Sequence, residues 1–147
     1  MKKLLLLIAL IGALYGYQQW QQPAEPPQNA VESAAAQSNQ RLQTAFKQKQ
    51  NNLQIQGRGI VSKTLPDDNK GSRHQRFVLK LDSGQTLLVA HNIDLSPKIK
   101  GLKKGDAVEF YGEYEWSQQG GVIHWTHHDP QHRHIDGWLK HNGVLYQ

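Results

Sequence analysis

The sequence predicts a small all-β domain, a five-stranded barrel, behind a hydrophobic N-terminal segment and a linker. Three observations support this fold class: short alternating hydrophobic segments between residues 55 and 128, glycines within and between them, and no long helical pattern in that region. Short strands with glycine bends are typical of small β-barrels. A chain of 147 residues has the length of one domain and a tail. We place the barrel at residues 53–147.

The first 17 residues are expected to be a signal peptide or an N-terminal anchor. Lys2 and Lys3 precede an apolar run that extends to about residue 15, the order found in secretory signals. The run is shorter than the roughly 20 apolar residues of a membrane-spanning helix, yet aromatic residues around Gly16 make a poor cleavage site. Cleavage and retention both stay open. Either outcome predicts a periplasmic or secreted domain in a bacterium, tethered to the inner membrane if the segment is retained.

Residues 18–52 have the composition of a linker. Gln, Ala, Pro, Asn and Ser dominate, and apolar residues are too few for a core. Leu42 and Phe46, four residues apart, indicate one weak helix across residues 34–48. The leader and linker also raise the calculated pI to 9.5, so the basic balance of the domain itself is only a weak sign of nucleic-acid binding. The chain has no cysteine, so any metal ligands must be His, Asp or Glu.

The strands of the barrel are expected in order along residues 55–128. Glycines bend the first strand, a tight turn at residues 82–84 joins the second to the third, and a turn at residues 117–121 joins the fourth to the fifth. The fourth strand alternates, with Val108 and Phe110 expected on the core side. The expected strands are residues 55–65, 76–81, 85–90, 107–116 and 122–128.

The start of the fourth strand resembles the OB-fold. Residues 102–112, Leu-Lys-Lys-Gly-Asp-Ala-Val-Glu-Phe-Tyr-Gly, combine a hydrophobic residue, a Gly-Asp turn and an alternating strand that contains glycine. The strand count and the missing or minimal helix between strands three and four suit the same fold. The predicted fold is therefore an OB-like barrel, and an SH3-like barrel is the alternative.

Several longer segments resemble an uncharacterised family of exported bacterial proteins, the domain of unknown function 3465. They include Arg-His-Gln-Arg-Phe at residues 73–77, Ala-His-Asn-Ile-Asp-Leu at residues 90–95, His-Trp-Thr-His-His-Asp-Pro at residues 124–130 and the segment 136–143. The resemblance extends from about residue 56 to the end. It implies the domain limits and export, and it implies no activity.

Residues 77–97 are similar in layout to staphylococcal-type nucleases. In those OB-fold phosphodiesterases a hairpin runs into a turn of the type Ile-Asp-x-Pro-Glu. The resemblance implies phosphodiester cleavage, but no Glu follows Pro97, and the region of His91 replaces an Arg of that family. Of the calcium-binding carboxylates, only Asp94 matches in place.

The densest chemical signal is a group of histidines near the C-terminus. All eight histidines follow residue 73, and five of them lie within residues 124–134. Imidazole exchanges protons near neutral pH and is the commonest metal ligand. The alternative is a solvated, aromatic-rich segment whose histidines only form hydrogen bonds. The residues expected to transfer protons are His74, His124, His127 and His128.

A divalent metal ion, Mg²⁺, Mn²⁺ or Zn²⁺, is a further expectation for this segment, although no complete ligand motif is present. A strand register that pairs the polar faces would place His124 and His128 beside Glu113 and Glu115, a carboxylate–imidazole patch suited to such an ion. The ligands expected from spacing are His128, Asp129, His132 and His134.

Substrate contacts are expected from two arginines and two aromatic residues. Arg73 and Arg76 are suited to hold phosphate, with ordinary surface ion pairs as the alternative. Trp125 and Tyr111 are suited to stack on bases, with a place in the core or a lid as the alternative for Trp125.

Together these features predict an exported protein that processes nucleic acid, as a phosphodiesterase or nuclease. The alternatives are a periplasmic OB-fold module that binds nucleic acid, a small ligand or an envelope partner without turnover, and metal buffering by the histidine-rich tail. No nucleophile elbow and no glycine-rich phosphate loop is present, which argues against a serine hydrolase and a P-loop enzyme.

Overall fold

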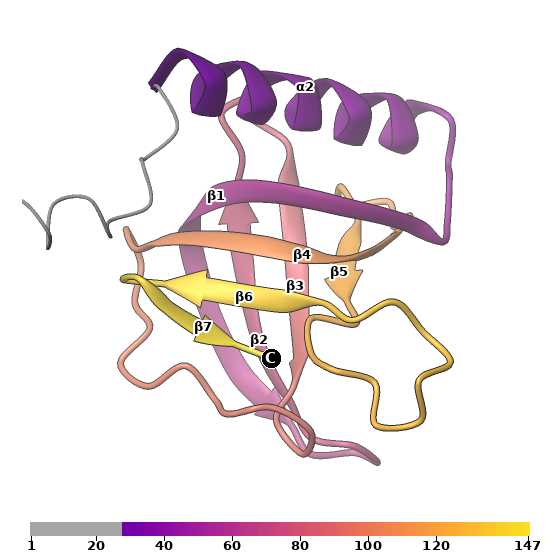
Figure 1. Cartoon of the computed structure of the whole chain (residues 1–147), viewed down its shortest axis with the longest axis vertical. Coiled ribbons are helices and arrows are strands. Elements are labelled where there is room, and N and C mark those ends of the chain that lie inside the picture. Colours follow the sequence, from indigo (N-terminus) through magenta and orange to yellow (C-terminus); the bar gives the residue numbers. More distant parts are fainter. Residues whose placement is uncertain (1–27) are drawn as a thin grey trace, which may run out of the picture. The chain divides into compact units, whose positions relative to one another are not determined.

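The computed structural model describes residues 28–147, which form one helix and seven strands (Figure 1). The expected signal or anchor at residues 1–17 and the first part of the expected linker lie outside the described residues. The elements are α2 (Gln28–Lys47), β1 (Leu53–Asp68), β2 (His74–Lys80), β3 (Thr86–Asn92), β4 (Ala107–Glu115), β5 (Val122–His124), β6 (Trp138–His141) and β7 (Val144–Tyr146).

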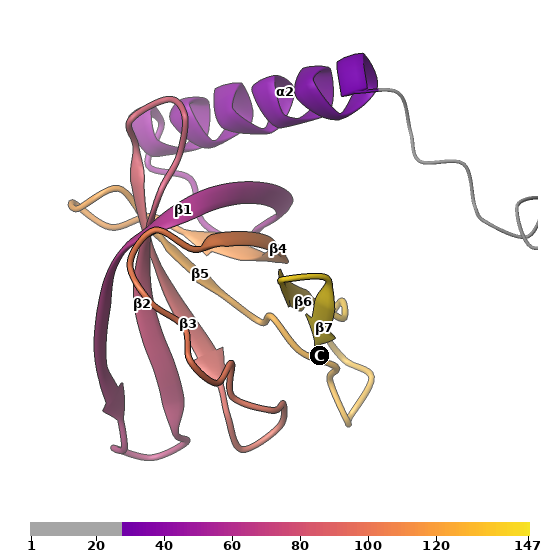
Figure 2. The same cartoon turned by 90° about the vertical axis from the view of Figure 1, so that its left-hand side faces the viewer.

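Five of the strands close a ring, which confirms the all-β, OB-like barrel. β1 pairs with β2 and β2 with β3, both antiparallel; β3 pairs in parallel with β5; β5 and then β1 pair antiparallel with β4. The ring is uneven because β1 has 16 residues and β5 only three. The β6–β7 hairpin is added to the outside of this ring along β4 (Figure 2).

β1 serves two neighbours because it is long and bends at glycines. Its residues 53–60 pair with β4, and the strand pairs with β2 from Ile60 onward. A Cβ at Gly57 would lie 2.5 Å from the tip of the Phe110 ring, so glycine lets this ring fill the barrel. β4 alternates strictly, with Val108, Phe110 and Tyr114 fully buried. The core therefore lies on the predicted side of this strand.

The helix is longer than predicted and contributes to the core. Its residues from Glu32 onward belong to the same compact unit as the barrel, which extends to Gln147. Leu42 and Ala45 are fully buried in the hydrophobic cluster, and the Ser38 hydroxyl donates a hydrogen bond to the Gln56 carbonyl of β1. Burial of a leucine stabilises a fold by about 2 kcal/mol. Within the described residues, no helix has both the length and the apolar character needed to cross a membrane.

Two sequence expectations about the C-terminal part need correction. The fifth strand ends at His124 instead of continuing to residue 128, because Trp125 has a φ of +52°, which ends the extended conformation. The β6–β7 hairpin, which begins at Trp138, was not expected at all. The segment between them, residues 125–137, is an irregular loop beside the start of β6 (Figure 1).

Candidate functional site

Four of the predicted site residues, His74, His124, Trp125 and His127, meet in a pocket of about 190 Å³ on the outer side of the barrel. β2 and β3 contribute its first wall, where His74 and Asn92 are paired across the two strands. β5 and the following loop contribute the second wall. Two larger hollows, of about 390 and 300 Å³, contain no histidine. The pocket is lined by His74, Ala90, Asn92, Leu95, His124, Trp125 and His127.

The loop after β5 is fixed at two points, and both hold its aromatic residues at the pocket. The Thr126 side chain is buried, and its hydroxyl lies 2.8 Å from Nδ1 of the buried His91. The Gly137 amide donates a 3.0 Å hydrogen bond to the His127 carbonyl. A Cβ at Gly137 would overlap the Trp125 carbonyl oxygen, so the close approach of the two ends of the loop requires glycine.

His127 has one defined tautomer when it is neutral. Its Nδ1 lies 2.6 Å from the His128 carbonyl oxygen, and a carbonyl only accepts, so Nδ1 carries the proton. Nε2 of the neutral ring therefore keeps its lone pair. The residue is 3% exposed and lines the pocket. A positioned imidazole with this tautomer is suited to accept a proton from a nucleophile.

His124 lies beside two carboxylates, as the sequence predicted for a register that pairs the polar faces. It is the direct strand partner of Glu113, and its Nε2 lies 3.3 Å from Oε1 of Glu113 and 3.9 Å from Oε1 of Glu115. Burial lowers the pKa of His124 below its ordinary value, and the charges of Glu113 and Glu115 oppose that shift only in part. His128, predicted beside the same carboxylates, lies elsewhere because the strand ends before it.

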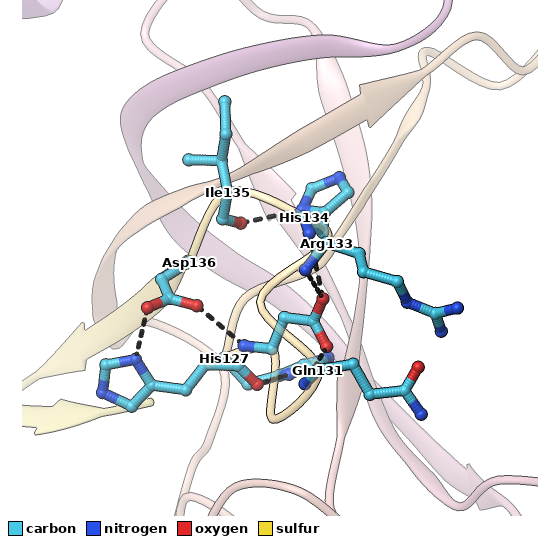
Figure 3. Close-up of polar contacts among 8 residues, drawn as sticks. His127, Gln131, Arg133, His134, Ile135 and Asp136 are labelled. Carbon is cyan, nitrogen blue, oxygen red and sulfur yellow. Dashed lines mark hydrogen bonds and ion pairs between the residues drawn. The ribbon is translucent and has the colours of Figure 1, made fainter.

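His134 connects Glu113 to the aromatic wall of the pocket. Its Nδ1 lies 2.7 Å from the Ile135 carbonyl (Figure 3), and its Nε2 lies 2.7 Å from Oε2 of Glu113, so both nitrogens face acceptors. Burial alone would lower the pKa of His134, but these two hydrogen bonds and the Glu113 charge outweigh it, and the net shift is upward. The ring stacks on Trp125, with centroids 4.1 Å apart and planes 7° apart. One face of Trp125 is thus covered by the imidazole ring of His134.

Asp129 organises the loop through its backbone. Its carboxylate accepts hydrogen bonds from the amides of Gln131, Arg133 and His134, at 2.7 to 3.0 Å (Figure 3). These donors, that of Gln131 foremost, hold the pKa of Asp129 below its usual value. The residue is 6% exposed, and its oxygens are already engaged. The arrangement gives Asp129 the role of a loop cap.

The four metal ligands expected from spacing do not converge on one point. His128 is exposed, and its Nδ1 lies 2.9 Å from Oδ2 of Asp136. His132 is exposed in a turn with φ +52°, Asp129 caps the backbone, and His134 faces Glu113. Among the described residues, the group whose ligand atoms lie within 4.8 Å of one another is Glu113, Glu115 and His124.

Of the four predicted substrate-binding residues, only Trp125 lines the pocket. Nε of Arg73 forms a 2.6 Å ion pair with Asp94. Arg76 donates Nε and Nη2 to the Pro66 carbonyl at 3.1 and 3.0 Å, and its strand partner is Ala90 of the pocket wall. Tyr111 lies outside the pocket lining and packs on Trp138, with ring centroids 6.3 Å apart.

Sequence reasoning missed one polar residue that borders the site. Gln54 of β1 is the direct strand partner of Glu113, and both its amide oxygen and its amide nitrogen are buried without a hydrogen bond. Its neighbours come from a strand that is 59 residues away in sequence, so only the β1–β4 register reveals it.

These features define a class of protein: a small OB-like barrel with an imidazole-lined pocket on its outer face. The chain belongs to a family described as protein of unknown function (DUF3465), whose family model matches residues 28–147. The predicted family resemblance is confirmed, and the match also includes helix α2, which precedes the segments that carried the resemblance. No curated protein and no solved structure matches the chain.

Proposed function

We propose that the protein is a phosphodiesterase that acts on nucleic acid, with the histidine pocket as its active site. The observation that carries this proposal is the convergence of His74, His124 and His127 on one pocket from two segments, β2 and the end of β5 with the loop after it. Three imidazoles beside an indole ring form a surface that can exchange protons and also contact a base or a sugar. Barrels of this shape commonly bind nucleic acids across their outer strands.

In this proposal His127 is the general base and His74 the general acid. Nε2 of His127 takes the proton from an attacking water or hydroxyl, a new P–O bond forms, and the bond to the leaving oxygen breaks. Protonated His74 then donates its proton to that oxygen. Each positioned imidazole contributes about 10²- to 10⁴-fold to such a reaction. The defined tautomer of His127 supports its assignment as the base.

Arg76 is the proposed phosphate-binding group. A guanidinium has five N–H donors, and the bonds to Pro66 use only Nε and Nη2. Its strand partner Ala90 lines the pocket, and Arg76 itself lines a second hollow together with Lys98 and Lys100. Arg73 is held by Asp94 and is assigned to the rim, where it adds positive charge along the path of the substrate.

The site of action belongs to the same proposal. Residues 1–17 have the order of an export signal, so the substrate would be nucleic acid in the periplasm or outside the cell. An anchor that is retained would hold the barrel at the inner membrane.

A non-catalytic binding module is the second candidate, and the half-buried aromatic residues on the outer face favour it. Tyr111 packs on Trp138 and Trp125 on His134. Stacking of bases on such rings contributes roughly 1–3 kcal/mol per base and needs no proton transfer. A module of this kind would bind single strands and leave them intact, and it would lose affinity on Trp125→Ala or Tyr111→Ala.

The experiment is incubation of the full chain with single- and double-stranded DNA and RNA, with the His74→Ala variant in parallel. His132→Asn is the matched control, because His132 lies outside the pocket and Asn tolerates its φ of +52°. We expect cleavage by the wild type and by His132→Asn and a loss of about 100-fold in His74→Ala. Cleavage that survives His74→Ala contradicts the proposal. Strands that are shifted on a native gel but never cut favour the binding module instead.

A further inference from the structure

Two carboxylates and an imidazole lie together on the outer face of β4 and β5. Glu113 and Glu115 follow each other on this face of β4, since strand residues two apart share a side. His124 of β5 is the direct partner of Glu113. One ligand atom from each of the three lies within 4.8 Å of the other two. Their mutual placement comes from paired strands, which hold side chains more rigidly than a loop does.

Three buried polar atoms beside this cluster have no hydrogen-bond partner. They are Nε2 of His124 and both amide atoms of Gln54. Nε2 lies 3.3 Å from Glu113, but the approach is not aligned as a hydrogen bond. Gln54 flanks Glu113 from the other side, on β1. A buried polar atom without a partner costs roughly 1–3 kcal/mol. Three such atoms next to one cluster of ligands are therefore suited to a bound ion and its water.

The distances suit a small divalent cation. Bonds of about 2.0–2.1 Å in a tetrahedral arrangement place ligand atoms roughly 3.4 Å apart. Nε2 lies 3.3 Å from Glu113 Oε1 and 3.9 Å from Glu115 Oε1, and one ligand atom of each residue lies within 4.8 Å of the others, so modest side-chain rotations would bring all three to one centre. Two negative charges beside an imidazole also compensate a divalent charge.

We propose that Glu113, Glu115 and His124 bind one divalent transition-metal ion, with zinc preferred. A set of one nitrogen and two oxygens suits Zn²⁺, whereas Mg²⁺ and Ca²⁺ favour oxygen ligands alone. Nε2 of His124 is the nitrogen ligand, and Gln54 is placed to hydrogen-bond a water on the ion. This ligand set differs from the one that sequence spacing indicated, since it uses no residue of the loop after Trp125.

Three protein ligands leave a coordination position for water or substrate, as in catalytic zinc sites. His124 also lines the histidine pocket, so the ion would lie at the edge of that pocket. There it would lower the pKa of a bound water toward neutrality, and that water is the nucleophile that His127 would deprotonate. This catalytic use rests on the proposed phosphodiesterase, whereas binding of the ion does not.

The test is titration of the full chain, freed of metal with EDTA and dialysed, with Zn²⁺ by calorimetry and with Co²⁺ by visible absorption. We expect one ion per chain. Glu115→Gln and His124→Asn each should weaken binding by about 100-fold, since even residues that only support a ligand change affinity by 10- to 100-fold. Glu109→Gln is the matched control, because Glu109 lies on the same face of β4 but pairs with Arg58 and Lys140.

A second control removes the exposed histidines with the double variant His128→Ala, His132→Asn. Zn²⁺ affinity that stays at the wild-type level in this variant and in Glu109→Gln supports the site, provided that the ligand variants keep the wild-type circular dichroism spectrum. Affinity that persists in folded Glu115→Gln and His124→Asn, or that disappears with the exposed histidines, overturns it. So does a wild type that binds no Zn²⁺.

The outcomes separate this site from the proposed function. A wild type that binds no Zn²⁺ but cuts nucleic acid in EDTA, dependent on His74, overturns the metal site alone. A chain that binds one Zn²⁺ through Glu115 and His124 but never cuts keeps the metal site and removes the phosphodiesterase.

Discussion

Histidines of the C-terminal segment form two groups that share a stretch of sequence but not an environment. The barrel-facing group, His124, His127 and His134, is buried or half-buried against the outer strands of the barrel, and each ring has a carboxylate or a carbonyl beside it. His128 and His132 are exposed, although His128 also has a carboxylate, that of Asp136, beside it. Burial therefore separates the two groups. The comparison teaches that the partners of each imidazole, and not its sequence neighbours, decide which chemistry it can carry.

The barrel-facing histidines also differ among themselves. In neutral His127, Nδ1 donates a hydrogen bond to the His128 carbonyl, and Nε2 can accept a proton. His134 has both nitrogens bonded to acceptors and a raised pKa, which favours the imidazolium. The loop therefore places a proton acceptor in the pocket and, beside it, a ring whose two hydrogen bonds favour the protonated form.

The sharpest test of the comparison replaces two adjacent residues. His127→Ala removes the proposed base, so kcat for nucleic-acid cleavage should fall by 100-fold or more. His128→Ala removes a ring whose side chain is 56% exposed and lies outside the pocket lining, and kcat should change less than twofold. The measurement is initial-rate kinetics on the substrate that the wild type cuts. Equal losses in the two variants would remove the distinction between the groups.

A third environment, the buried His91, predicts acid sensitivity of the fold. Burial lowers its pKa to about 4, and its nitrogens are bonded to Thr126 and to the Pro97 carbonyl. The unfolded chain takes up this proton near pH 6.5, but the folded chain does so only near pH 4. Stability is therefore lost as pH falls through this window, by about 3 kcal/mol in total. Urea unfolding at pH 7 and pH 4 measures it.

The control for this prediction is His91→Gln, which keeps hydrogen-bonding groups near Thr126 but does not titrate. The variant should be less stable than the wild type at pH 7 and lose less stability on acidification. An identical pH dependence in both proteins would assign the acid sensitivity to other groups.

Local patterns predicted most of the barrel and part of the site. The alternation around Val108 and Phe110 gave the inner face of β4, and it also placed Glu113 and Glu115 outward. The position of His124 beside them depended on register, which the sequence left open as one alternative. Four of the predicted residues, His74, His124, Trp125 and His127, do line one pocket. Their proposed roles stay predictions.

What the sequence did not predict depends on tertiary contacts. β5 stops at His124 because Trp125 adopts a positive φ, a conformation that is uncommon for a bulky residue without support. That support comes from the hydrogen bond between the Thr126 hydroxyl and His91 and from the close packing of Gly137 against the Trp125 carbonyl. The burial of Ala45 in a polar-looking helix likewise depends on the barrel surface beneath it. No local pattern encodes these contacts.

Asp129 fixes the loop that carries His134, and its removal should loosen that loop. Asp129→Ala leaves the amides of Gln131, Arg133 and His134 without their acceptor. The melting temperature should fall by roughly 5–10 °C, and His134 should lose its fixed position on Trp125. Asp68→Ala is the control, because Asp68 accepts one amide hydrogen bond, from Lys70, in an exposed turn. Similar small losses in both variants would show that the loop does not depend on Asp129.

The smallest expected effect concerns the charge of His134. Its raised pKa means that its stabilising contribution is fully present below pH 6.5 and is lost as pH rises through the folded value. His134→Phe keeps a flat ring to stack on Trp125 but removes the hydrogen bond to Glu113. Melting in EDTA at pH 6 and pH 9 should show a deficit of about 3 °C at pH 6 that shrinks at pH 9. A deficit that is constant across this range would mean that stacking, and not the pairing with Glu113, holds His134 in the barrel-facing group.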